Sequence, residues 1–190
     1  MTENGSYRGG ILMQTPSLLA VGRDNNIPVD YTRELGDHLK TARVSVSTWD
    51  FACSTSPIAI RDRDKDQALI SVGHFVPIDF DPLMHGLPRL IREARKYGEP
   101  ASVLELLALK AGGEILNLLT SETNPLSRLP ALGTPLEDCA IVPGISRIPQ
   151  TKYWRLTPIR AHEWLSAPHS MLISVVLERN DFKTSAESEY

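Results

Sequence analysis

Two residues with the chemistry of a cysteine hydrolase lie close together in this chain. Cys53 precedes His74 by 21 positions, and each lies at the edge of a segment with the composition of a buried strand. A free thiol titrates near about 8.5, so a nucleophilic cysteine needs a base such as histidine to form a thiolate at neutral pH. The alternative is structural, with Cys53 as a small buried side chain and His74 as a hydrogen-bonded packing residue. On the pair alone, the structural alternative is favoured.

The segments around this pair predict how the two side chains could meet. Polar and apolar residues alternate from Arg43 to Trp49, which predicts a strand that buries Val44 and Val46 and leads to Cys53. The apolar runs 56–60 and 68–76 flank the charged sequence RDRDKD, which is typical of a solvated turn. Antiparallel pairing of the two runs would form a hairpin and bring Cys53 close to His74.

The rest of the chain predicts two helices and further strands. Residues 87–97 place Leu87, Leu90, Ile91 and Ala94 on one helical face, with Gly98 at the C-terminal end. The sequence from Ser102 to Glu105 fits a capping box before a second, Leu/Ala-rich helix, which Gly112 and Gly113 interrupt. Short apolar segments from Ile141 onward, including 153–156 and 171–177, are typical of strands, and residues 125–149 resemble a long Pro-rich connection. We therefore predict an α+β fold, a single domain with antiparallel or mixed β layers packed against two helices.

Composition limits the classes of function. The chain has 190 residues, of which 42% are hydrophobic and 23% charged, so it should fold as one domain, over residues 11–180, with flexible ends at 1–10 and 181–190. A net charge of −3 does not favour nucleic acid as a partner. The longest apolar runs fall short of a membrane span and the N-terminus lacks a signal-peptide pattern, so we expect a cytoplasmic protein without membrane insertion.

The remaining cysteine and histidines give no second site. Cys53 and Cys139 are expected to be reduced thiols, with Cys139 a structural residue in an apolar run. The five histidines are scattered in dissimilar contexts, so neither a metal site nor a cofactor is predicted.

The order of strand, Cys53, hairpin, His74, helix and Gly-Gly segment resembles the CheD family of chemoreceptor glutamine deamidases. These are cysteine amidohydrolases of the cytotoxic-necrotizing-factor type, in which a strand enters a Gly-Ser-Cys turn and a hairpin returns to Ala-His. Here the turn is Asp50-Phe51-Ala52-Cys53 and the return is Gly73-His74. The resemblance implies a protein substrate, a chemoreceptor, and a regulatory protein partner, a CheC-type phosphatase. It also matches residues 108–113 to a segment that is a strand in the family, whereas the capping box predicts a helix; both interpretations remain open.

The resemblance implies a reaction without a cofactor. His74 would take the Cys53 proton, and the thiolate would attack a glutamine carboxamide, with backbone N–H groups of the cysteine turn stabilising the oxyanion. Water activated by His74 would then hydrolyse the thioester to glutamate. A family threonine that orients the imidazole falls on Ser47 or Thr48, and Asp50 is an alternative for this role.

Two other functions are compatible with the same residues. One is a non-enzymatic assembly or interaction protein, such as a capsid subunit, a phage component or an adaptor, in which Cys53 is inert. The other keeps the nucleophile but hydrolyses a peptide or an ester, since an acyl-thioester intermediate serves all of these reactions.

Overall fold

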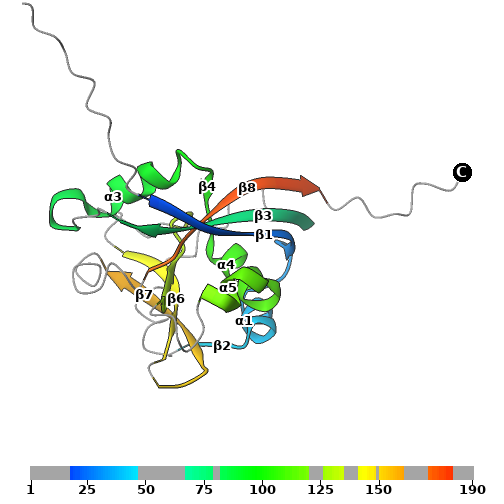
Figure 1. The fold of residues 1–190 in the computed structure, drawn as a ribbon. Helices are drawn as coiled ribbons and strands as arrows, with labels where there is room; N and C mark the ends of the chain where they lie inside the picture. The colour runs from blue at the N-terminus through cyan, green and yellow to red at the C-terminus, as the bar shows by residue number, and fades with distance from the viewer. Residues whose placement is uncertain are drawn as a thin grey trace, which may run out of the picture.

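The computed structural model describes residues 18–46, 67–78, 82–119, 126–134, 141–148, 150–160 and 171–181. Within these ranges the chain forms four helices and eight strands, and the strands make two four-stranded sheets (Figure 1). Helices and strands are mixed along the chain, which confirms the predicted α+β fold class.

The first sheet, sheet A, is antiparallel throughout. Its strands lie in the order β1 (Leu18–Asp30), β3 (Gln67–Pro77), β8 (Ile173–Asp181) and β4 (Glu99–Pro100). Most of β3 is buried, as expected for a central strand whose two faces are both covered. The register between β1 and β3 shifts between Ala20 and Gly22 and again between Asp24 and Ile27, so the 13-residue strand β1 is irregular at two places.

The second sheet, sheet B, contains one parallel pair. Its order is β2 (Val44–Val46), β7 (Trp154–Arg160), β6 (Ile141–Arg147) and β5 (Arg128–Pro130), and only β2 and β7 run parallel. The two sheets meet where the Leu172 N–H donates to the Arg128 carbonyl oxygen at 3.0 Å. Val44 is buried and Val46 partly buried, as predicted.

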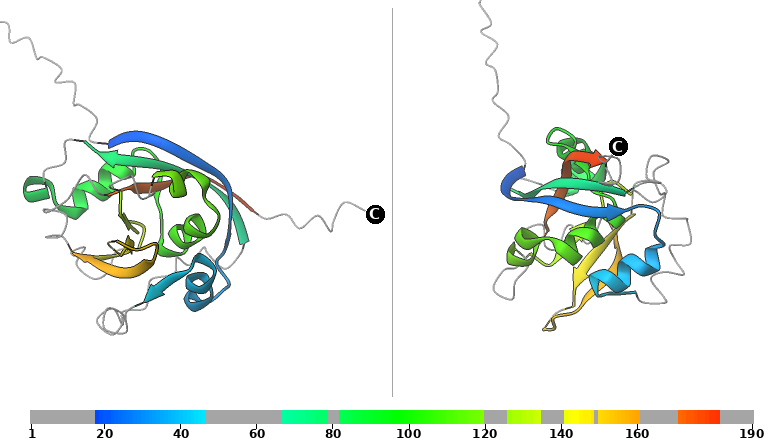
Figure 2. Two further views of the ribbon diagram at one scale, coloured as in Figure 1. Left: turned by 60° about the horizontal axis from the view of Figure 1, so that its bottom comes forward. Right: turned by 90° about the vertical axis from the view of Figure 1, so that its right-hand side faces the viewer.

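Helix α4 (Val103–Gly112) lies between the two sheets (Figure 2). The Ser102 hydroxyl accepts from the Glu105 N–H, and the Glu105 carboxylate accepts from the Ser102 N–H at 2.6 Å, so the predicted capping box is confirmed. Every residue from Val103 to Leu109 is buried, because the helix is surrounded by protein. The segment that the family resemblance matches to a strand is therefore helical here.

Three further helices surround this arrangement. The predicted helix at 87–97 is α3 (Pro82–Ala94), which begins five residues earlier and ends three residues earlier than expected. Its predicted apolar face is buried against Phe75, Ile173 and Val175 of sheet A, in a cluster separate from the one around α4. The short helix α5 (Glu114–Leu119) follows α4, and α1 (Leu35–Ala42) connects the two sheets between β1 and β2.

Some elements differ from the sequence prediction. Neither β1 nor α1 was predicted, and the Pro-rich connection at 125–149 contains β5 and all of β6. The strands predicted near residues 153–156 and 171–177 are confirmed as β7 and β8. The predicted flexible ends lie outside the described residues, apart from Asp181, the last residue of β8.

Candidate functional site

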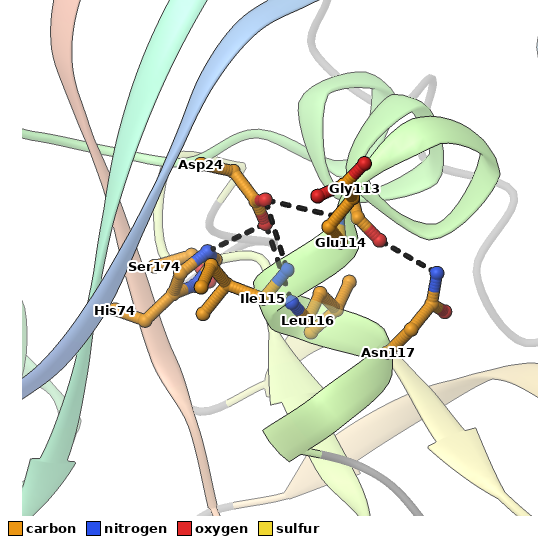
Figure 3. A network of polar contacts seen from close by, with 8 residues as sticks. All are labelled: Asp24, His74, Gly113, Glu114, Ile115, Leu116, Asn117 and Ser174. Atoms are coloured by element: carbon orange, nitrogen blue, oxygen red, sulfur yellow. Dashed lines mark hydrogen bonds and ion pairs between the residues drawn. The ribbon is translucent and has the colours of Figure 1, made fainter.

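His74 is at the centre of a buried polar network in sheet A (Figure 3). Its side chain is 0% exposed and lies directly opposite Ser174 of β8 in the strand register. The ring Nδ1 is 3.1 Å from Ser174 Oγ, and Nε2 is 3.1 Å from Asp24 Oδ2. Both ring nitrogens therefore have partners inside the protein.

Asp24 extends this network to the start of α5. Its Oδ1 accepts from the backbone N–H groups of Glu114 and Ile115, both at 3.0 Å, and its Oδ2 accepts from that of Leu116 at 3.2 Å. The first N–H groups of a helix have no partner within the helix, so a carboxylate from β1 replaces the usual N-cap side chain. The network thus joins α5 to three strands of sheet A, namely β1, β3 and β8.

Two glycines permit this close approach. A Cβ atom on Gly22 would lie 2.5 Å from Ile115 Cγ2, so glycine allows α5 to pack against β1. A Cβ atom on Gly113 would lie 2.8 Å from Asp24 Oδ2 and 2.6 Å from the Leu109 carbonyl oxygen. A larger residue at either position would separate the helix from the carboxylate.

Burial lowers the pKa of His74, and the hydrogen bond and negative charge of Asp24 only partly oppose this effect. The imidazole is therefore neutral near pH 7. Since a carboxylate only accepts hydrogen bonds, Nε2–H donates to Asp24, and Nδ1 accepts from the Ser174 hydroxyl.

Serine, histidine and aspartate are also the components of a hydrolytic triad, but this set lacks two features that hydrolysis needs. In the triad, serine contacts Nε2 and aspartate contacts Nδ1, which is the reverse of the arrangement here. Ser174 is 1% exposed, so no substrate carbonyl can reach its hydroxyl in this conformation. The geometry is that of a structural network.

Of the predicted catalytic residues, the structure describes only His74. Cys53, Ser47 and Thr48 lie outside the described residues, so their predicted roles stay predictions. The hairpin that was expected to bring Cys53 to His74 is wrong, because β3 is paired along one edge with β1 and along the other with β8. A strand has only two edges, and both edges of β3 are paired; the other run of the predicted hairpin, residues 56–60, lies outside the described residues.

A cavity of about 390 Å³ lies between the end of β1, α1, the start of β3 and α4. Its apolar lining consists of Pro28, Val29, Leu107, Ala108, Ala111 and Gly112. Its polar lining consists of Asp30, Arg33, His38, Thr41 and Gln67. A largely apolar concave surface with a few converging polar groups is the usual form of a small-molecule site.

Sequence reasoning identified His74 but none of the other residues in the network or the cavity. Asp24 lies in an irregular part of β1, where the sequence GRDNN indicates a turn rather than a buried carboxylate. Asp30 had a weak local signal, because an aspartate two residues before a threonine favours a side-chain to backbone turn. That turn forms: the Thr32 N–H donates to Asp30 Oδ1 at 3.0 Å.

Within the described ranges, no three carboxylate, imidazole or thiol groups come together as metal ligands do. In the same ranges no helix is long and apolar enough to cross a bilayer. Comparisons of the chain with protein-family models, with curated proteins and with solved structures found no match.

Proposed function

We propose that this chain is a non-enzymatic binding protein that holds a small molecule in the cavity between β1, α1, β3 and α4. The observation that carries the proposal is the cavity itself, with a volume of about 390 Å³, an apolar wall and five polar side chains at one place. Ligand sites have volumes of roughly 300–1,000 Å³, so the ligand belongs to the small end of that range.

The state of His74 supports a binding role over a catalytic one. A general base must reach the proton that it removes, and this imidazole is fully buried with both nitrogens in hydrogen bonds. The cysteine amidohydrolase remains a prediction, since Cys53 lies outside the described residues. It would need a rearrangement of sheet A or a different base.

Filling the cavity tests the proposal. Ala111 lines the cavity and is exposed, so Ala111→Leu adds volume there without entering the core. We expect a thermal-shift screen of small polar metabolites to find ligands that stabilise the wild type and Ala20→Leu, a matched change at an exposed position of β1, but not Ala111→Leu. A screen that finds no stabilising ligand would refute the proposal, and so would ligands that stabilise Ala111→Leu as much as the wild type.

Thiol labelling separates binding from the cysteine chemistry. If the protein is not a hydrolase, alkylation of Cys53 should be as slow as that of Cys139 and unchanged in His74→Gln, measured under conditions where that variant remains folded. Fast labelling of Cys53 with an apparent pKa below that of a free thiol, lost in His74→Gln, would support the amidohydrolase instead.

A further inference from the structure

The cavity contains a fixed negative charge at Asp30. Its Oδ1 accepts from the Thr32 N–H at 3.0 Å and from the Thr32 hydroxyl at 2.5 Å, and its Oδ2 accepts from Gln67 Nε2 at 2.9 Å. The Thr32 hydroxyl, with further contributions from the Thr32 N–H, Gln67 and the nearby Arg33, lowers the pKa of Asp30 despite some burial. The carboxylate is thus ionised and held in one orientation, and each oxygen of a carboxylate can accept more than one hydrogen bond.

A positive charge lies three residues away at Arg33, an exposed residue. Its Nη2 donates to Thr41 Oγ1 at 3.2 Å, and the Thr41 hydroxyl in turn donates to the Asp37 carbonyl oxygen at 2.9 Å. A guanidinium has five N–H donors in a planar fork that matches a carboxylate. The contact with Thr41 positions the guanidinium while leaving most of this fork for a ligand.

The rest of the cavity lining is largely apolar, and most of its residues from α4 are small. Ala108, Ala111 and Gly112 line the cavity from the last turns of α4, and Pro28 and Val29 line it from β1. Neither Ala108 nor Ala111 has a side chain long enough to fill the space beside it. The wall therefore suits a short apolar group of a ligand.

We infer that the cavity binds a free α-amino acid with an apolar side chain, an inference that rests on the proposed binding function. The ammonium group would donate to Asp30 Oδ2, the carboxylate would accept from Arg33, and the side chain would pack against α4. A ligand with a single charge would bond to only one of these two groups. A nucleotide or a dinucleotide cofactor would bring several negative charges to one arginine and place them beside the Asp30 carboxylate.

Calorimetric titration with leucine and its analogues tests the ligand class. N-acetyl-leucine lacks the ammonium charge, leucinamide lacks the carboxylate, and 3-methylbutylamine has the apolar chain and the amine alone. We expect leucine to bind and each analogue to bind at least about tenfold more weakly, the equivalent of about 1.4 kcal/mol. Phenylalanine and methionine, titrated in parallel, should bind like leucine or more weakly according to their size.

Charge-removing variants locate the binding site. Asp30→Asn and Arg33→Gln should each weaken leucine binding at least about tenfold. Glu178→Gln and Arg92→Gln remove the same charges outside the cavity lining and should bind like the wild type. Circular dichroism and a thermal melt of each variant distinguish a lost contact from a lost fold.

Three results would overturn the inference, and they can be told apart from failure of the binding function. Equal binding of leucine and N-acetyl-leucine or 3-methylbutylamine would refute the need for both charges. Unchanged binding in Asp30→Asn and Arg33→Gln would place leucine elsewhere. If no amino acid binds while another ligand stabilises the wild type but not Ala111→Leu, the inferred ligand class is wrong and the proposed binding function stands. If no ligand of any kind binds, the inferred ligand class and the proposed binding function are both wrong.

Discussion

At the scale of single residues, His74 illustrates how environment decides what an imidazole does. An accepting carboxylate on one side and a donating hydroxyl on the other fit the neutral ring, so its burial leaves no hydrogen-bonding group unsatisfied. A proton added to Nδ1 would face the Ser174 oxygen in a fully buried site. The protein therefore gains stability from keeping this side chain neutral.

The pH dependence of stability measures this effect. The pKa of His74 is lowered in the folded state, whereas in the unfolded chain it returns to about 6.5. The unfolded chain therefore binds the extra proton, and we expect the free energy of unfolding to fall as pH decreases below about 6.5, by at most about 1.4 kcal/mol per pH unit from this group. Urea denaturation between pH 7.5 and 5 should show this slope in the wild type.

The same measurement on His74→Gln provides the comparison. This variant should be less stable at pH 7.5 but should lose less further stability on acidification, because it lacks the imidazole whose pKa folding lowers. The lowered pKa of Asp30 acts below about pH 3.8 and does not contribute between pH 7.5 and 5. A slope that is identical in the two proteins would contradict a buried neutral His74.

The hydrogen-bond partners of His74 could not be predicted from the sequence, for a physical reason. Asp24 and Ser174 are 50 and 100 positions from His74, and only the pairing of β3 with β1 and β8 brings them together. The hairpin hypothesis assumed that β3 pairs with the nearest apolar run in sequence. Both edges of β3 pair instead with strands distant in the sequence, β1 and β8, and no local sequence pattern indicates this pairing.

At the scale of elements, α5 depends on its surroundings. A six-residue helix is too short to be stable alone, because the cost of its first turn exceeds what so few hydrogen bonds return. Three of its backbone N–H groups donate hydrogen bonds to Asp24, and its own residue Leu116 is fully buried. The helix forms because β1 supplies the cap.

Adjacent glycines at the junction of α4 and α5 should respond in opposite ways to alanine. Gly113→Ala places a Cβ atom against Asp24 Oδ2 and the Leu109 carbonyl oxygen, and we expect a loss of about 1–3 kcal/mol in the free energy of unfolding. Gly112→Ala meets nothing within 4 Å and should be neutral or stabilising by up to about 1 kcal/mol. Chemical denaturation of both variants checks this, and equal effects would contradict the described approach of Asp24.

Elements with complete local signals were the ones predicted correctly. The capping box at Ser102 and the apolar face of α3 depend on residues three or four positions apart, so they can be read from a short window. In β1 the two register shifts interrupt the alternation of buried and exposed residues that would have indicated a strand. The strand β1 forms because its backbone pairs with β3.

At the scale of the whole molecule, α4 joins the two sheets into one unit. Its buried residues belong to one core cluster with Ile70 and Val72 of sheet A and Ile145 and Leu156 of sheet B. Glu105, also fully buried, accepts from the Tyr31 hydroxyl at 2.8 Å and bonds with Arg179 of β8. Neither sheet can leave α4 without exposing apolar surface.

A truncation in α4 should therefore destabilise both sheets together. Leu106 is 0% exposed, and we expect Leu106→Ala to lower the free energy of unfolding by about 2–5 kcal/mol. Native-state hydrogen exchange should show the same decrease for amides of β3 in sheet A and of β6 in sheet B. A decrease confined to one sheet would contradict a shared core.

The irregularity of β1 has a consequence for how copies of the protein behave toward one another. This strand is the first in the order of sheet A, so among the described strands only β3 pairs with it. A long, regular strand with one unpaired edge can act as a template for fibril growth. Asn26 adopts a left-handed conformation at φ 55°, and Pro28 carries no N–H group to offer a neighbouring chain. The irregularities that prevented the prediction of β1 from the sequence thus also oppose aggregation of the folded protein through this edge.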